Sequence, residues 1–207
     1  MSRETPLITK RKIVLLALLL AVFYLAFKPS GLWFLTTEGM AAIANNTEDY
    51  TDQNGYVLPE AYKISIDLSD LDSNIGKELY DDGTYKIYVS SLDNTGSARS
   101  GGYRIGFRSK GTYSHHGASL VSGVWHKTVD EHSFTTIMSA KMAAAYNNKN
   151  YTSSQFAISG LNYKDGDDFG FYIFPSEAYG KDISFQETGT VELTVTGLYR
   201  NSWSKKS

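Results

Sequence analysis

All four histidines of the chain lie in one short segment, Ser114 to His132. Imidazole and carboxylate groups are suitable zinc ligands, and the chain has no cysteine that could supply a thiolate. If Ser122-Gly123 is the tip of a β-hairpin, His115 faces Asp130 across the strands and His132 lies diagonal to His115. The segment therefore gives a candidate metal site made of His115, Asp130 and His132.

An ordinary amphipathic hairpin explains the same pattern and is the preferred interpretation. Strand alternation would turn Leu120, Trp125 and Val129 inward and most of the histidines outward. The spacing matches no known zinc signature, because HxH and HExxH are both absent. A helix that began before His132 would also separate the three ligands.

Acidic turns offer a second kind of cation ligand. Calcium takes carboxylate and amide oxygens, and two segments carry several of them, although neither has the spacing of an EF-hand. Solvated turns are the favoured interpretation, because Asp, Asn and Gly are common in turns without any ion. The residues in question are Asp67, Asp70, Asp72 and Asn74 in the first segment, and Asp165, Asp167 and Asp168 in the second.

Three further residues are candidates for ligand binding. Arg104 and Arg108 alternate with apolar residues on a predicted strand, so their guanidinium groups share a face that could meet an acidic glycan or a phosphate. Trp125 could provide a stacking surface for a sugar or an anchor for a protein partner. The alternative is a solvated strand face with a half-buried tryptophan.

Catalytic signatures are missing from the sequence. GxSxG, HExxH and the Walker loop are absent, so we expect no enzyme. A metal-dependent hydrolase that uses the His/Asp cluster is the third-ranked hypothesis, and Zn or Ca the only cofactor to consider. A serine paired with His126 or His132 carries little weight, since a serine-rich chain always permits such a pair.

Charge and composition restrict the class of protein. Residues 45–207 contain fifteen Lys/Arg and twenty Asp/Glu, a net charge of −5, which disfavours nucleic-acid partners. Without cysteine the domain has no disulfide and must be held together by its core. The 15 tyrosines and 18 glycines favour β structure over a helical bundle.

The N-terminal segment predicts a membrane anchor. Fifteen apolar residues, Ile13 to Phe27, follow Lys10-Arg11-Lys12, and 13–35 is long enough for a spanning helix. The basic residues would hold the N-terminus in the cytoplasm. The alternative is a signal peptide cleaved after Ala44, which the long distance from Phe27 disfavours.

Period-two alternation dominates the rest of the chain and predicts an antiparallel β-sandwich or jelly roll. The clearest alternating segments are 62–68, 85–90, 103–110 and 191–196. The segment 133–147 has Phe134, Met138 and Met142 at helical spacing, with Ser133 as N-cap, and predicts one short helix. A strand is the alternative there, because the same three residues also fit a period of two.

The sequence thus predicts four parts and a non-catalytic role. The parts are a basic cytoplasmic tail (1–12), a transmembrane signal anchor (13–35), a tether (36–55) and an extracytoplasmic β domain (56–207). The expected function is a structural or binding subunit of an envelope, appendage, virion or membrane assembly, acting through protein contacts. Carbohydrate binding by exposed aromatic residues is the runner-up hypothesis.

Overall fold

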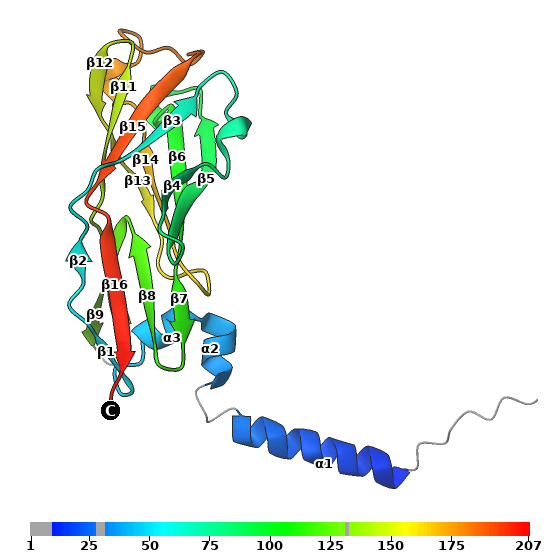
Figure 1. Cartoon of the computed structure of the whole chain (residues 1–207). Helices are drawn as coiled ribbons and strands as arrows, with labels where there is room; N and C mark the ends of the chain where they lie inside the picture. Colours follow the sequence, from blue (N-terminus) through cyan, green and yellow to red (C-terminus); the bar gives the residue numbers. More distant parts are fainter. Residues whose placement is uncertain (1–9, 28–31, 131–132) are drawn as a thin grey trace, which may run out of the picture.

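A computed structural model describes residues 10–27, 32–130 and 133–207. Its strands form two units that follow one another along the long axis of the β domain (Figure 1). Strands are the main elements of the described residues, the sheets are antiparallel and helices are few, so the mainly β, antiparallel prediction is confirmed. The two units are called the distal unit and the proximal unit below, the proximal unit being the one that contains α3.

The distal unit consists of two antiparallel sheets that share one core. Each sheet is listed here in the order of its hydrogen-bonded neighbours. The first contains β12 (Lys149–Thr152), β11 (Lys141–Tyr146), β15 (Thr190–Thr196) and β3 (Tyr62–Asp67). The second contains β13 (Ser154–Ile158), β14 (Asp168–Tyr172), β6 (Tyr103–Lys110), β5 (Lys86–Asn94) and β4 (Glu78–Asp81).

Strand alternation explains the core of the distal unit. Successive residues of a strand point to opposite faces, so every second side chain can be buried. In β6 the residues Tyr103, Ile105 and Phe107 are buried and alternate with Arg104 and Arg108, which are half-buried on the outer face. The predicted alternating segments therefore form strands, with their apolar residues in the common core.

The proximal unit has one larger sheet and a two-stranded hairpin. The sheet contains β1 (Tyr50–Asp52), β16 (Tyr199–Lys205), β8 (Gly117–Ser122) and β7 (Thr112–Ser114), and β2 (Tyr56–Val57) also pairs with β16. The hairpin contains β9 (Val124–Asp130) and β10 (Ser133–Met138). A second core lies between this sheet and α3 (Met40–Ala44), and it includes Met40, Ile43, Leu120 and Trp203.

Two further helices precede this domain. They are α1 (Lys10–Phe27) and α2 (Leu32–Glu38), and the short 3₁₀ turns elsewhere are Asp72–Asn74, Ala98–Ser100 and Ser176–Ala178. The C-terminus lies at the same end of the β domain as α2 and α3 (Figure 1). Within the described residues, none of the helices has both the length and the apolar character needed for a membrane span.

The predicted helix at 133–147 is wrong, because this segment forms β10 and β11. In β11, Met142, Ala144 and Tyr146 are buried and alternate with exposed Lys141, Ala143 and Ala145. The alanine-rich composition favours a helix locally, but pairing with β12 and β15 satisfies the backbone and buries one face. Tertiary contacts thus override local propensity here.

The segment expected to be a tether, 36–55, contributes to the folded domain in the structure. Met40 and Ile43 of α3 are fully buried in the proximal core, and Tyr50 of β1 joins them. Strand β1 also pairs with the C-terminal strand β16. The compact part of the chain therefore begins near residue 40 rather than at residue 56.

Candidate functional site

The histidine segment does not form the predicted hairpin. Strand β8 pairs with β7 and β16, whereas β9 pairs with β10, so the chain passes from one sheet to another at Gly123. A Cβ atom at Gly123 would lie 2.5 Å from the ring of Phe169, which explains why the crossing requires glycine. The register that would place His115 opposite Asp130 is therefore absent.

Two of the three predicted metal ligands, His115 and Asp130, lie on different hairpins. His115 is in the two-residue turn between β7 and β8, with its ring centroid 3.7 Å from that of His116. Asp130 ends β9. His132 lies outside the described residues, so the three-residue metal site stays a prediction. Among the residues that the structure describes, no group of three or more His, Asp or Glu side chains could hold a metal ion.

One histidine, His126, takes part in a fully buried polar cluster. Its Nε2 lies 2.6 Å from Oδ2 of Asp167, and the Ser122 hydroxyl donates to the same carboxylate at 2.8 Å. All three side chains are completely shielded from solvent. The side chain of Asn201 lies beside the cluster, accepting from the backbone N–H of His126 and donating to the Val124 carbonyl.

This cluster is structural rather than nucleophilic. In a Ser-His-Asp triad the imidazole lies between the hydroxyl and the carboxylate, so that it can remove the hydroxyl proton. Here Asp167 lies between Ser122 and His126, and no solvent reaches any of them. The residues come from β8, β9 and the segment just before β14, so the cluster joins the two units of the domain.

In the two acidic turns, polar side chains also make hydrogen bonds within the domain. The Asn74 side chain is buried and donates to the carbonyls of Asp67, Asp70 and Leu71, which closes the first turn. In the second turn, Asp167 faces the interior and Asp168 faces the outer surface of the distal unit. Their carboxylates therefore do not converge on a common point.

Arg104 and Arg108 lie on the same outer face, as predicted, and each is paired within the domain. Arg104 makes two hydrogen bonds to Asp93, at 2.7 and 2.9 Å, and Arg108 makes two to Asp168, at 2.8 and 3.0 Å. These contacts raise the pKa of both guanidinium groups above the ordinary value. Their charges are therefore largely compensated, which weakens the attraction for a phosphate or an acidic glycan.

An aromatic ring packs against the guanidinium group of each Arg–Asp pair. The Arg104 guanidinium lies 4.6 Å from the ring centre of Phe156, and that of Arg108 lies 3.4 Å from the ring centre of Tyr163. The Tyr163 hydroxyl donates to Asp168 at 2.8 Å, and this bond, with burial, raises the pKa of the phenol. Stacking and bidentate bonding together fix the planes of both guanidinium groups.

A trough crosses the sheet between these two pairs and is called the outer trough below. Its floor is a row of small residues from four neighbouring strands: Ser91, Gly106, Gly170 and Ala157. One wall carries Asp93, Arg104 and Tyr172, and the other carries Tyr88, Arg108 and Asp168. A pocket of about 280 Å³ lies in the trough, lined also by Ser90 and Phe156.

Trp125, the third predicted ligand-binding residue, lies elsewhere. It is half-buried on β9, and its ring stacks on Tyr199 with centroids 5.4 Å apart. Ile137 lies directly opposite it on β10 and is exposed. The structure thus separates Trp125 from the two arginines, which belong to the other unit.

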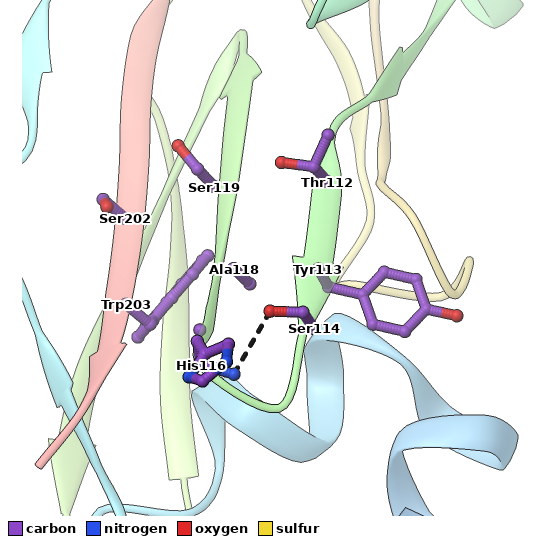
Figure 2. A pocket seen from close by; sticks show the side chains of 9 residues that line it. Thr112, Tyr113, Ser114, His116, Ala118, Ser119, Ser202 and Trp203 are labelled. Carbon is purple, nitrogen blue, oxygen red and sulfur yellow. Dashed lines mark hydrogen bonds between the residues drawn. The ribbon is translucent and has the colours of Figure 1, made fainter.

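A second shallow pocket, of about 340 Å³, lies on the proximal sheet (Figure 2). Hydroxyl groups of Thr112, Ser119 and Ser202 form a row across β7, β8 and β16. The Ser114 hydroxyl accepts from the backbone N–H of His116, and the ring of Tyr113 extends away from Ser119, Ser202 and Trp203 (Figure 2). This pocket is hydroxyl-rich but has no charged pair along its walls.

Two features of these sites were missed by the sequence analysis. The interior role of Asp167 was not predicted, although two adjacent aspartates at the start of a strand must face opposite ways. The sequence also contains a pattern that could have indicated the outer trough. Gly106 and Gly170 each interrupt an alternating strand, and such a glycine indicates a bulge or a close approach of another part of the chain.

No family model, curated protein or solved structure matches this chain. The functional conclusions below therefore depend on its own residues and geometry.

Proposed function

We propose that this protein is a membrane-attached β module that lies outside the cytoplasm and acts as a structural or binding subunit of a larger assembly. The surface of α1 carries this proposal. Its large apolar side chains between Ile13 and Tyr24 are all exposed, from 49% for Tyr24 to 66% for Phe23. A helix that is apolar all round is stable in lipid or protein surroundings rather than in water.

The charges next to α1 support an orientation for this attachment. Lys10, Arg11 and Lys12 form its first turn, and basic residues beside an apolar helix favour the cytoplasmic side of a membrane. In this orientation the β domain, which follows the helix, lies on the opposite side.

The proximal core supports an uncleaved N-terminus in this proposal. Cleavage after Ala44 would remove α3, and with it Met40 and Ile43, which are fully buried against Leu120 and Trp203. Loss of two large buried side chains would leave a cavity, and each such truncation costs about 2–5 kcal/mol. The helix α1 therefore stays joined to the β domain.

Exposed apolar residues on the β9–β10 hairpin support contacts with a protein partner. Val129 is 61% exposed and Ile137 is 42% exposed, and both lie on the outward face of the hairpin near Trp125. Apolar side chains next to an aromatic anchor are typical of the central part of a protein interface.

Membrane attachment is tested by fractionating cells that produce the full chain. We expect the unaltered protein in membranes after an alkaline carbonate wash, and release of the variant Leu15→Asp/Leu19→Asp. Val129→Asp, the same type of change in the β domain, serves as the matched control and should stay in the membrane fraction. Recovery of the unaltered protein in the wash would refute the attachment.

The role in an assembly is tested by isolating the protein from its native membrane in mild detergent. We expect a complex larger than one chain, and its loss in the double variant Val129→Asp/Ile137→Asp. A lone monomer from the native source would contradict this part of the proposal, whatever the result of the carbonate wash.

A further inference from the structure

We propose that the outer trough binds one ring of an uncharged saccharide. This inference goes beyond the proposed function and does not depend on attachment to a membrane. It depends on three properties of the trough: compensated charges on its walls, hydroxyl groups without partners on its floor, and an aromatic ring at its side.

The compensated charges decide between a neutral and an acidic ligand. Each wall contains one guanidinium and one carboxylate in bidentate contact, Arg104 with Asp93 and Arg108 with Asp168. An anionic ligand would have to compete with these carboxylates and would be repelled by them. Of these four groups Asp168 lines the pocket itself, and the hydroxyls of a neutral polyol can donate to its carboxylate without bringing a second negative charge.

A β-bulge brings additional hydroxyl groups to the floor. The register between β5 and β6 shifts between Val89 and Ser91, so that Ser90 is the extra residue. Oγ of Ser91 and Oγ of Ser90 lie 2.3 and 3.5 Å from the position that a Cβ at Gly106 would occupy. Within the described part of the chain neither hydroxyl has a hydrogen-bond partner, and bulges are common beside binding sites.

The remaining side of the pocket is aromatic and its volume is small. The ring of Phe156 lines the pocket, and apolar ring faces suit the C–H groups of a sugar. About 280 Å³ lies just below the roughly 300–1,000 Å³ of ordinary small-molecule pockets, which suits one ring rather than an extended chain. Gly106 and Gly170 keep the floor low, since a Cβ at Gly106 would collide with Ser91.

The probes are arrayed neutral oligosaccharides of glucose, galactose and mannose, with sulfated oligosaccharides as the acidic comparison. The full chain is held in a zwitterionic detergent, because sugar-based detergents would compete. We expect millimolar or tighter binding to at least one neutral class, weakened about tenfold or more by Ser90→Ala/Ser91→Ala, since each lost hydrogen bond is worth severalfold. Neither hydroxyl supports the fold, so this variant should unfold like the original protein.

Thr112→Ala/Ser202→Ala is the matched control, because it removes two hydroxyls from the pocket in Figure 2. It should leave saccharide binding unchanged. Three outcomes would each overturn the proposal: no binding to any neutral class, binding to sulfated oligosaccharides alone, or equal weakening by both pairs of substitutions. A further variant, Ser91→Trp, should fill the pocket and abolish binding. If this variant folds and still binds the saccharide undiminished, the outer trough is not the binding site.

Discussion

Asp167 and Asp168 are adjacent in the sequence, yet they serve opposite parts of the molecule. The carboxylate of Asp167 is fully buried and bonded to His126 and Ser122. That of Asp168 is 32% exposed and bonded to Arg108 and Tyr163. Strand alternation alone separates them, since consecutive side chains point to opposite faces of the sheet.

The difference shows how two adjacent residues, one just before β14 and one at its start, can serve the interior and the outer surface of the domain. Asp167 faces the junction between the two units, where a buried polar group requires hydrogen-bond partners that are fixed in position. Asp168 forms a wall of the outer trough, where solvent screens its charge and its oxygens remain accessible. The same residue type therefore contributes to the interior in one place and to the proposed binding surface in the other.

The largest expected effect is that of Asp167→Ala. Removing one partner of a buried ionic or hydrogen-bonded pair leaves the other groups without compensation, and this costs about 3–5 kcal/mol of unfolding free energy. Urea unfolding of the full chain, followed by tryptophan fluorescence at neutral pH, measures the loss. Asp168→Ala is the matched control, and equal losses for the two variants would remove the distinction between the two aspartates.

A double replacement sharpens the interpretation of the buried cluster. We expect His126→Phe/Asp167→Leu to lose less stability than the sum of the two single variants, because the imidazole and the carboxylate are removed together and only the Ser122 hydroxyl loses its acceptor. The same unfolding assay gives the coupling free energy through a double-mutant cycle. Additive losses would show that His126 and Asp167 act independently.

Asp168→Asn should lower stability by only about 0.5–1 kcal/mol, as expected for a half-exposed ion pair. The loss should shrink at high salt, because screening already weakens the pair in the original protein. Unfolding curves at low and at molar salt measure both effects. A loss as large as that for Asp167→Ala would mean that Asp168 is also part of the cohesive core.

The strands could be predicted from the sequence where one face is buried and the other is polar. In β6 and β15 this alternation is regular, and the predicted segments agree with the observed strands. Prediction failed for β11, since its alanines fit a helix as well as a strand and only pairing with β12 and β15 decides between them. The spacing of apolar residues in the sequence does not show which strands will pair, so it cannot decide between helix and strand here.

The sites were less predictable because they depend on which strands become neighbours. The shared face of Arg104 and Arg108 followed from alternation, but their partners Asp93 and Asp168 come from two other strands. The prediction of a hairpin in the histidine segment was wrong for the same reason, since β8 and β9 separate at Gly123 and pair with different strands. Alternation gives the direction of a side chain, whereas topology determines what it meets.

The smallest expected effect is on the titration of Tyr163. Its phenol donates to Asp168, and this bond is the main reason why its pKa lies above the ordinary value of 10.0, with burial adding to it. Asp168→Asn should therefore lower the pKa of Tyr163, which NMR of ¹³C-labelled tyrosine can follow. Tyr62, whose pKa is raised to about 12 by burial and by Glu60, should not change and serves as the internal control.

The sign of the accompanying stability effect follows from the same shift. A phenol whose pKa is raised by folding contributes stability that is intact below the ordinary pKa and is lost as the pH rises through the folded value. Asp168→Asn should therefore reduce the part of the alkaline loss that arises from Tyr163. An unchanged Tyr163 titration would show that its hydroxyl does not depend on Asp168, and the wall of the outer trough would then lack its phenol–carboxylate bond.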